Sequence, residues 1–182
     1  RGHLKLIERV QSYAGNDIKS VVFSFDMVPF FKEKGLKKKN LMTSEEKRLF
    51  LEGRADCLVE CPFVEDIYTM EAESFIKEVL SDKFHAKYVV VGTDFRFGHN
   101  KRGDVHMLRQ YENVYGYQLD VVEKEMYGTR EISSTFIKEE VVKGNIELVE
   151  KLLGRPYFVA GNVKHGNMLG RKLGFPTMNI IP

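Results

Sequence analysis

Three short segments of the chain combine residue types that bind anions with positions where a sheet protein holds a ligand. Gly2-His3 opens a helical pattern, Gly92–Asp104 follows the clearest buried-strand pattern, and Ile132–Lys138 opens another helix. Backbone N–H groups and the positive dipole at a helix N-terminus attract phosphate. Parallel sheets bind ligands at the carboxyl ends of their strands. We therefore expect the three segments to share one phosphate-binding rim.

The segment Gly92–Asp104, GTDFRFGHNKRGD, carries the most varied chemistry. Phe95 and Phe97 alternate about Arg96, so an extended backbone would point both rings the same way. One interpretation is that a planar ligand stacks on these rings while its phosphate meets an arginine such as Arg102 or the next helix start. The other is that the rings anchor an ordinary loop to the core. The residues alone favour neither interpretation.

The other two segments also have simpler explanations. A lone Gly-His is more often a polar helix start than a ligand site. The hydroxyls of Ser133, Ser134 and Thr135 are typical of a serine-rich helix cap. Capping explains Lys138 less well, because this lysine lies one turn into the same helix and is expected to face the same way. Lys138 therefore supports an anion cradle.

Composition and spacing exclude several other classes of function. The five histidines show neither His-x-x-x-His nor His-x-x-Glu-His spacing, and no P-loop or nucleophile-elbow motif occurs. A formal charge of +2 with a single lysine run, Lys37–Lys39, argues against a nucleic-acid partner. No apolar run approaches the ~20 residues of a membrane span. We expect a soluble cytoplasmic protein that binds small molecules, and the sequence does not indicate its oligomeric state.

The two cysteines predict no disulfide. Cys57 and Cys61 would share one face of a short strand. At that spacing their Cα atoms lie about 13 Å apart, beyond the ~7 Å limit for a disulfide. We expect them to be buried, unbridged thiols.

Helical and strand patterns alternate along most of the chain. Strands are expected at 20–25, 57–60, 88–91 and 118–123, and helices from 6 to 14, 43 to 52, 72 to 80, from 104 on, and at 135–143 and 146–153. Thr43 with Glu46 forms a capping-box pattern, and Asp104 is a candidate cap. Gly144-Asn145 is expected to be a helix stop followed by a new cap, and a basic loop is expected before Asn40. This alternation predicts an α/β, doubly wound parallel sheet. Its first strand would precede residue 1.

The pattern changes after Leu153. A strand at 157–164 is followed by the closely spaced Gly161, Gly166, Gly170 and Gly174, with Pro176, which is typical of turn-rich β structure. We place a domain boundary near Gly154. The sequence ends at Pro182 inside a strand pattern, and we expect it to be cut at both ends.

Taken in order, four motifs resemble bacterial bifunctional riboflavin kinase/FAD synthetase. They are GTDFRFGHNKRGD at Gly92–Asp104, ISSTFIK at Ile132–Lys138, LLGRPY at Leu152–Tyr157 and GNVKHGNMLGRKLGFPT at Gly161–Thr177. The resemblance implies that residues 1–153 are an N-terminally truncated FMN adenylyltransferase domain, which joins FMN to the AMP part of ATP. Residues 154–182 would begin a riboflavin kinase β-barrel that is truncated at its C-terminus.

The resemblance also implies roles for particular residues. His3, Ser134, Thr135 and Lys138 would be catalytic, whereas Gly2, Gly92, Asp94, Phe95, Phe97, Arg102 and Ser133 would bind ATP or FMN. Gly166, Gly170, Arg171, Thr177 and Asn179 would bind nucleotide in the kinase. Thr177 and Asn179 would hold Mg²⁺ through ATP. ATP, FMN and riboflavin would be the small-molecule partners, FAD a product, and this fragment alone should not phosphorylate riboflavin.

Some residues depart from the family pattern, and two other functions remain open. Lys138 stands where the family usually has arginine, Met178 replaces alanine, and Met27-Val28-Pro29 replaces Pro-His-Pro. The first histidine of the family's His-x-Gly-His motif is missing. One alternative is a flavin or nucleotide-binding module that has lost catalysis. The other is a nucleotidylyltransferase of the same superfamily that acts on nicotinamide mononucleotide or phosphopantetheine.

Overall fold

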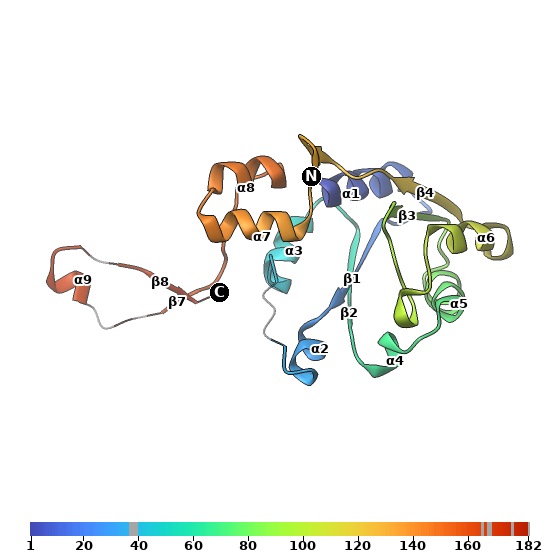
Figure 1. Ribbon diagram of the computed structural model, residues 1–182, viewed down its shortest axis with the longest axis horizontal. Helices are drawn as coiled ribbons and strands as arrows, with labels where there is room; N and C mark the ends of the chain where they lie inside the picture. Colours follow the sequence, from blue (N-terminus) through green and yellow to red (C-terminus); the bar gives the residue numbers. More distant parts are fainter. Residues whose placement is uncertain (37–39, 165, 167–168, 176, 182) are drawn as a thin grey trace.

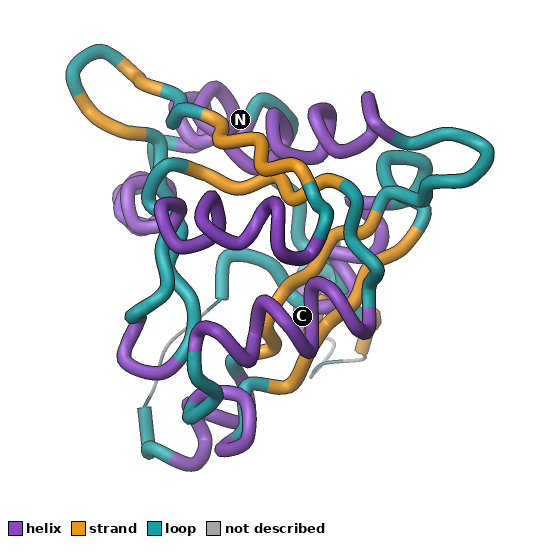
Figure 2. The backbone as a smooth tube through the Cα atoms, turned by 90° about the vertical axis from the view of Figure 1, so that its right-hand side faces the viewer, coloured by secondary structure: helices purple, strands orange, loops and turns teal. Residues whose placement is uncertain are grey.

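The computed structural model is a mixed α/β protein and describes residues 1–36, 40–164, 166, 169–175 and 177–181 (Figure 1). The lysine run Lys37–Lys39, Pro176 and Pro182 therefore lie outside the described residues. Figure 2 shows helices around the strand pairs. No helix in the described ranges is long and apolar enough to cross a membrane.

Helices and strands alternate through most of the chain, as expected. The helical elements are α1 (Gly2–Tyr13), α2 (Val28–Glu33), α3 (Ser44–Leu51), α4 (Glu65–Tyr68), α5 (Ala72–Ser74), the π-helix η1 (Phe75–Lys83), the 3₁₀ turn η2 (His99–Lys101), α6 (Val105–Tyr115), α7 (Ser134–Lys143), α8 (Ile146–Leu153) and α9 (Leu169–Lys172). The strands are β1 (Val21–Asp26), β2 (Cys57–Pro62), β3 (Tyr88–Gly92), β4 (Gln118–Val122), β5 (Met126–Tyr127), β6 (Arg130–Glu131), β7 (Asn162–Lys164) and β8 (Asn179–Ile181).

The longer strands pair in parallel, as the alternating pattern predicts. In one pair Val21 of β1 lies opposite Cys57 of β2, and in the other Tyr88 of β3 lies opposite Gln118 of β4. The described strands form four two-stranded sheets, the other two being the antiparallel pairs β5–β6 and β7–β8. The parallel direction is thus confirmed, while a single continuous sheet is not seen among the described strands.

Helix caps agree closely with the sequence signals. Thr43 and Glu46 form the complete capping box of α3, and the Asp104 carboxylate accepts the Met107 N–H at 2.9 Å to cap α6. Gly144 ends α7 in the left-handed conformation, with φ of 77°. Asn145 stands at the start of α8 without a capping bond, because its amide donates to Glu140 instead.

Two hydrophobic cores support the strand ends. The larger one joins η1, β3 and α6 around Ile76 and Leu108, which are fully buried. The smaller one joins α7 to α8 around Val149 and Leu152. These cores fix the ends of β3, β4 and α7, where the candidate residues lie.

Tertiary packing changes three local expectations. The segment before Asn40 contains helix α2 rather than only loop, because Phe30 packs against Phe63 and Tyr68 at centroid distances of 5.4 Å. Of the strand expected at 157–164, only 162–164 forms. Both cysteines are free, as predicted, yet Cys57 is exposed and Cys61 is only partly buried. The expectation of buried thiols is therefore wrong, since little packs over that strand face.

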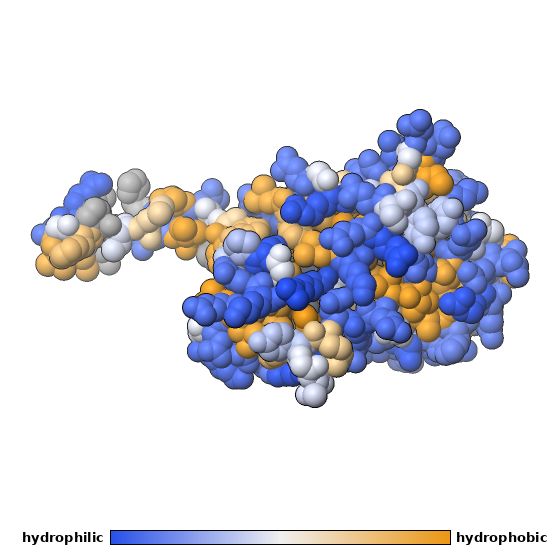
Figure 3. Space-filling view, turned by 90° about the horizontal axis from the view of Figure 1, so that it is seen from above, coloured by the Kyte–Doolittle hydropathy of each residue, from blue (hydrophilic) through white to orange (hydrophobic). Residues whose placement is uncertain are grey.

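The C-terminal segment extends away from the rest of the molecule (Figures 1 and 3). It contains the antiparallel pair β7–β8 and helix α9. Its apolar side chains are exposed, including Leu173 and Phe175 at 73% and 78%. Hydrophobic residues accordingly gather at this protruding end in Figure 3.

Candidate functional site

A cavity of about 310 Å³ opens where the N-termini of α1 and α7 meet the carboxyl ends of β3 and β4. We call it the α1/α7 cavity. Its lining comes from the start of α1, the residues after β3 and β4, the N-terminal turn of α7, part of α3 with the loop before it, and the end of α8. Helix N-termini and strand ends thus converge on one space, as expected for a phosphate-binding rim.

Six of the residues selected from the sequence line this cavity. They come from three segments far apart in the chain: Gly2 and His3, Gly92 and Asp94, Ser133 and Ser134. The geometric expectation that the segment after β3 faces both helix starts is therefore confirmed. The chemical roles of these residues stay a prediction.

His3 lies in the first turn of α1 and lines the cavity. Desolvation by the surrounding protein lowers the pKa of its imidazole, against a smaller opposing effect of the Asp94 carboxylate. Because an ordinary histidine pKa is already near 6.5, the His3 ring is neutral at pH 7. A neutral ring offers one N–H donor and one acceptor nitrogen to a ligand.

Asp94 is held by a cation that the sequence analysis missed. The Lys124 ammonium lies 3.0 Å from Asp94 Oδ2 and 2.5 Å from Glu131 Oε2, and both carboxylates raise its pKa. Lys124 also lines the cavity, two residues after β4 ends. The rule that ligands bind after strand ends would have found Lys124 if it had been applied to β4.

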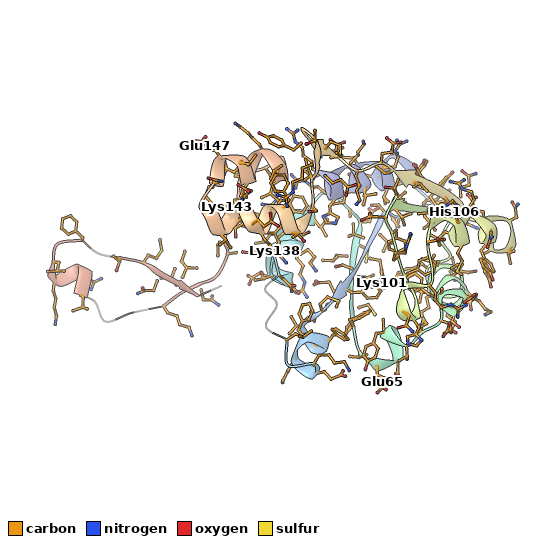
Figure 4. The ribbon with its side chains drawn as sticks, viewed as in Figure 1. Glu65, Lys101, His106, Lys138, Lys143 and Glu147 are labelled. Atoms are coloured by element: carbon orange, nitrogen blue, oxygen red, sulfur yellow. The ribbon has the colours of Figure 1, made fainter. Side chains whose placement is uncertain are left out.

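The N-terminus of α7 meets the expectations only in part. Ser133 caps the helix, since its Oγ accepts the Phe136 N–H at 3.2 Å. Thr135 and Lys138 are exposed and do not line the cavity, so the expectation that Lys138 faces into the cradle is not met. Figure 4 labels Lys138 on α7. Ile137, one residue earlier, does line the cavity, and because an α-helix has 3.6 residues per turn the next side chain, Lys138, lies on a different face of α7.

The loop after β3 packs against the larger hydrophobic core. Phe97 is 4% exposed, lies in the larger core and contacts Phe75 at a centroid distance of 5.4 Å. Its backbone exchanges two hydrogen bonds with Gly103, and any side chain in place of this glycine would strike the Phe97 ring. Of the two interpretations of this loop, the structure supports core anchoring for Phe97 and contradicts an exposed stacking surface there.

Two further candidates of this loop lie outside the α1/α7 cavity. Arg102 forms an exposed ion pair with Glu71 at 3.0 Å. Phe95 stacks on Phe97 and lines a second cavity of about 800 Å³, which we call the strand-edge cavity. That cavity lies between β1 and β3 and is lined mostly by apolar side chains, so it gathers fewer of the candidate residues despite its size.

The residues expected for a kinase lie together at the C-terminal segment. Gly166 approaches Asn179 so closely that a side chain at 166 would strike the asparagine amide, and Gly170 similarly faces Phe175 and Thr177. Arg171 lies on α9. Among the described residues, no group of three or more His, Cys, Asp or Glu side chains is placed to hold a metal ion.

Comparisons with known proteins agree with this geometry. The FAD synthetase family matches residues 1–136, and the riboflavin kinase family matches residues 153–182. A bifunctional riboflavin kinase/FMN adenylyltransferase of Buchnera aphidicola from Schizaphis graminum is 34% identical over 98% of this chain and 59% of its own length. One from Haemophilus influenzae is 35% identical over 77% of this chain and 46% of its own length. The chain thus spans about half the length of these relatives.

A solved structure shares the fold. It is described as the macrolide-efflux protein of Streptococcus pneumoniae and matches with a TM-score of 0.80 and 26% identity, over 99% of this chain and 59% of that one. The fold, the convergence of three segments on one cavity, and the matches over residues 1–136 and 153–182 point to one conclusion. The chain belongs to the FAD synthetase family.

Proposed function

We propose that this chain provides the FMN adenylyltransferase activity of a bifunctional riboflavin kinase/FAD synthetase. It would transfer AMP from ATP to FMN, releasing pyrophosphate and forming FAD. Residues 1–153 would make up the adenylyltransferase domain, with a doubly wound nucleotidylyltransferase fold. Residues 154–182 would begin the kinase barrel of a protein that also phosphorylates riboflavin to FMN.

One observation carries this proposal. Six of the residues that line the α1/α7 cavity come from three separate segments singled out in the sequence, and all three segments offer groups that suit a phosphate chain. Two helix N-termini aim at one space, and their dipoles act on an anion there in the same sense. The match of residues 153–182 to riboflavin kinase supports this acceptor over nicotinamide mononucleotide or phosphopantetheine.

The reaction is a direct displacement at phosphorus. An oxygen of the FMN phosphate forms a bond to the α-phosphorus of ATP, the bond from that phosphorus to the bridging oxygen breaks, and pyrophosphate leaves with the electron pair. Such chemistry depends on positioning and charge neutralisation rather than on a covalent nucleophile. We therefore assign no serine or cysteine as a nucleophile.

The chain's own groups would divide this work. His3 donates its N–H to a phosphate oxygen, while Ser134 and Thr135 hold the departing phosphates by their hydroxyls and backbone N–H groups. Asp94, oriented by Lys124, holds the adenylyl side. The cavity of about 310 Å³ is at the small end for a ligand site, so part of the nucleotide extends beyond it, where Lys138 can neutralise pyrophosphate.

Magnesium fits the donors that the chain offers. Mg²⁺ in nucleotide enzymes is held by one or two protein oxygens together with substrate phosphates. The Thr177 hydroxyl and the Asn179 amide oxygen are hard donors of this kind, two residues apart in the C-terminal segment. Bound with ATP, the ion would supply charge neutralisation on the phosphates.

Incubating the purified protein with FMN, ATP and Mg²⁺ tests the proposal. We expect FAD and pyrophosphate to appear in equal amounts, measured by chromatography and by a pyrophosphatase-coupled assay. Parallel reactions with nicotinamide mononucleotide or phosphopantetheine as acceptor should give no pyrophosphate. A protein that binds ATP and FMN but forms no FAD would be the catalytically inactive binding module instead.

A further inference from the structure

Arg155 lines the α1/α7 cavity, although it belongs to the segment that matches riboflavin kinase. The chain reaches the cavity through Gly154, which ends α8 with φ of 73°. A side chain at Gly154 would come within 3.0 Å of Arg1 Cγ in addition to the backbone strain. The glycine therefore allows the tight turn that brings Arg155 back beside α1.

The guanidinium group of Arg155 is oriented by two aromatic rings. It lies 4.9 Å from the ring centroid of Phe50 and 4.9 Å from that of Phe158. Its own N–H groups donate to Pro156 O at 2.8 Å and towards the weak acceptor Met42 Sδ at 3.3 Å. Stacking on aromatic faces leaves the edge of a guanidinium available for further hydrogen bonds.

Backbone hydrogen bonds hold the segment that follows Arg155. The Tyr157 N–H donates to Glu150 Oε1 at 3.1 Å, and the Ala160 N–H donates to Glu46 Oε1 at 2.8 Å. The second oxygen of Glu46 accepts the Thr43 N–H, so backbone groups use both oxygens of this nearby carboxylate. The arginine thus belongs to an ordered segment.

Arg155 differs from Lys124, which lines the cavity together with Arg1 and Arg155. Lys124 is neutralised by Asp94 and Glu131, whereas Arg155 forms no ion pair within 4.0 Å among the described residues. Desolvation lowers the pKa of Arg155, although an arginine remains charged at neutral pH. A partly buried, charged guanidinium beside a helix N-terminus is suited to bidentate binding of a phosphate group.

We propose that Arg155 binds a phosphate group of the nucleotide in the α1/α7 cavity, so that the kinase-matching segment completes the adenylyltransferase site. This inference rests on the proposed function for the identity of the nucleotide. The recognised chemistry is a phosphate chain, and inorganic pyrophosphate is its simplest probe. The role is distinct from that of Lys138, which lies outside the cavity.

The variant Arg155→Met tests the inference because it keeps an unbranched stem between the two rings and removes the charge. We expect the dissociation constants of pyrophosphate and ATP to rise about 10- to 100-fold, the usual effect of losing a charged hydrogen bond. The dissociation constant of FMN and the melting temperature of the protein should stay near their wild-type values. Arg155→Lys should be intermediate, since it keeps the charge without the fork. Isothermal titration calorimetry measures all three ligands.

Arg54 provides a matched control. Its guanidinium stacks on the same Phe50 ring at 5.1 Å and donates to Phe50 O at 3.0 Å, yet it does not line the cavity. Arg54→Met should leave pyrophosphate affinity unchanged. Equal weakening by both variants would mean that Phe50 packing is responsible and would overturn the inference.

The remaining outcomes separate this inference from the proposed function. Unchanged pyrophosphate affinity in Arg155→Met overturns the inference, and so does a wild-type protein that binds no pyrophosphate. If the wild type forms FAD in either case, the proposed function stands. If the wild type forms no FAD but loses pyrophosphate binding with Arg155, the inference stands and the proposed function fails.

Discussion

The strand-edge cavity and the α1/α7 cavity differ in both size and chemistry: the larger one is mainly apolar, and the smaller one gathers polar groups. The strand-edge cavity is larger, about 800 Å³, and lies between β1 and β3, which in the described residues pair only with β2 and β4. Its walls are mainly apolar side chains of these strands, η1 and α1. The α1/α7 cavity is less than half as large, yet two helix N-termini and two strand ends meet there.

The difference shows that convergence of polar groups, rather than volume, marks the candidate site. Both cavities contain residues from the loop after β3: Phe95 lines the first and Asp94 the second. The chain turns at this point, since the Phe95 N–H donates to Gly92 O at 3.0 Å, and the two side chains enter different cavities. One loop therefore supplies an aromatic ring to the apolar side and a carboxylate to the polar side.

Removal of the Phe97 ring should give the largest effect. Phe97→Ala is expected to lower the free energy of unfolding by about 3–5 kcal/mol, because it deletes a buried ring from the core beside the strand-edge cavity. Urea denaturation measures this loss. Phe97→Leu is the milder control and should retain FMN affinity. A stable Phe97→Leu protein with greatly weakened FMN binding would show that the Phe97 ring stacks on FMN, and that the loop after β3 does more than pack against the core.

Lys138 lies outside both cavities and tests how far the functional site extends. Lys138→Ala should lower kcat for FAD formation about 10²–10³-fold if this lysine neutralises departing pyrophosphate. Lys138→Arg should retain or improve activity, since arginine binds phosphate bidentately. The exposed Lys151 on α8 is a control whose alanine variant should leave kcat unchanged. Equal rates for Lys138→Ala and wild type would confine the site to the α1/α7 cavity.

Tyr13 allows a smaller test at the strand-edge cavity. Its hydroxyl donates to Asp120 Oδ2 at 2.8 Å, and its ring stacks on Tyr88 at a centroid distance of 4.2 Å. Tyr13→Phe keeps the stack and should cost about 1 kcal/mol of stability in thermal unfolding. FAD formation should be unaffected, because Tyr13 is at the opposite end of α1 from His3. A large loss of activity would show that this cavity takes part in the reaction.

The smallest expected effect is the contribution of His3 to the pH dependence of stability. The pKa of His3 in the folded protein is lowered, mainly by desolvation, so the unfolded chain binds a proton more readily. Stability should therefore fall as the pH drops below about 6.5 and level off below the lowered pKa of the folded state. His3→Gln should flatten that part of the stability profile, measured by denaturation between pH 5 and 7.5. An unchanged slope in the variant would exclude His3 as its source.

The sequence by itself determined the local features of this protein. The capping box at Thr43, the cap at Asp104 and the stop at Gly144 each depend on a few neighbouring residues, and all three were predicted. The three segments of the α1/α7 cavity were also found, because residues after strands and at helix starts are identifiable in the sequence. These features form through hydrogen bonds between residues that are close in the sequence, so the local sequence is enough to predict them.

Only the tertiary structure decided which side chains reach the cavity. Alternation predicts that Phe95 and Phe97 share one side, but packing of η1 and α6 determines that this side is the core. Ile137 lines the cavity, whereas Lys138, the next residue of α7, lies on a different face of the helix. Lys124 follows a strand end, but Arg155 enters from a segment that no local pattern connects with the site. Contacts between residues far apart in the chain depend on how the elements pack, and periodicity in the sequence does not encode them.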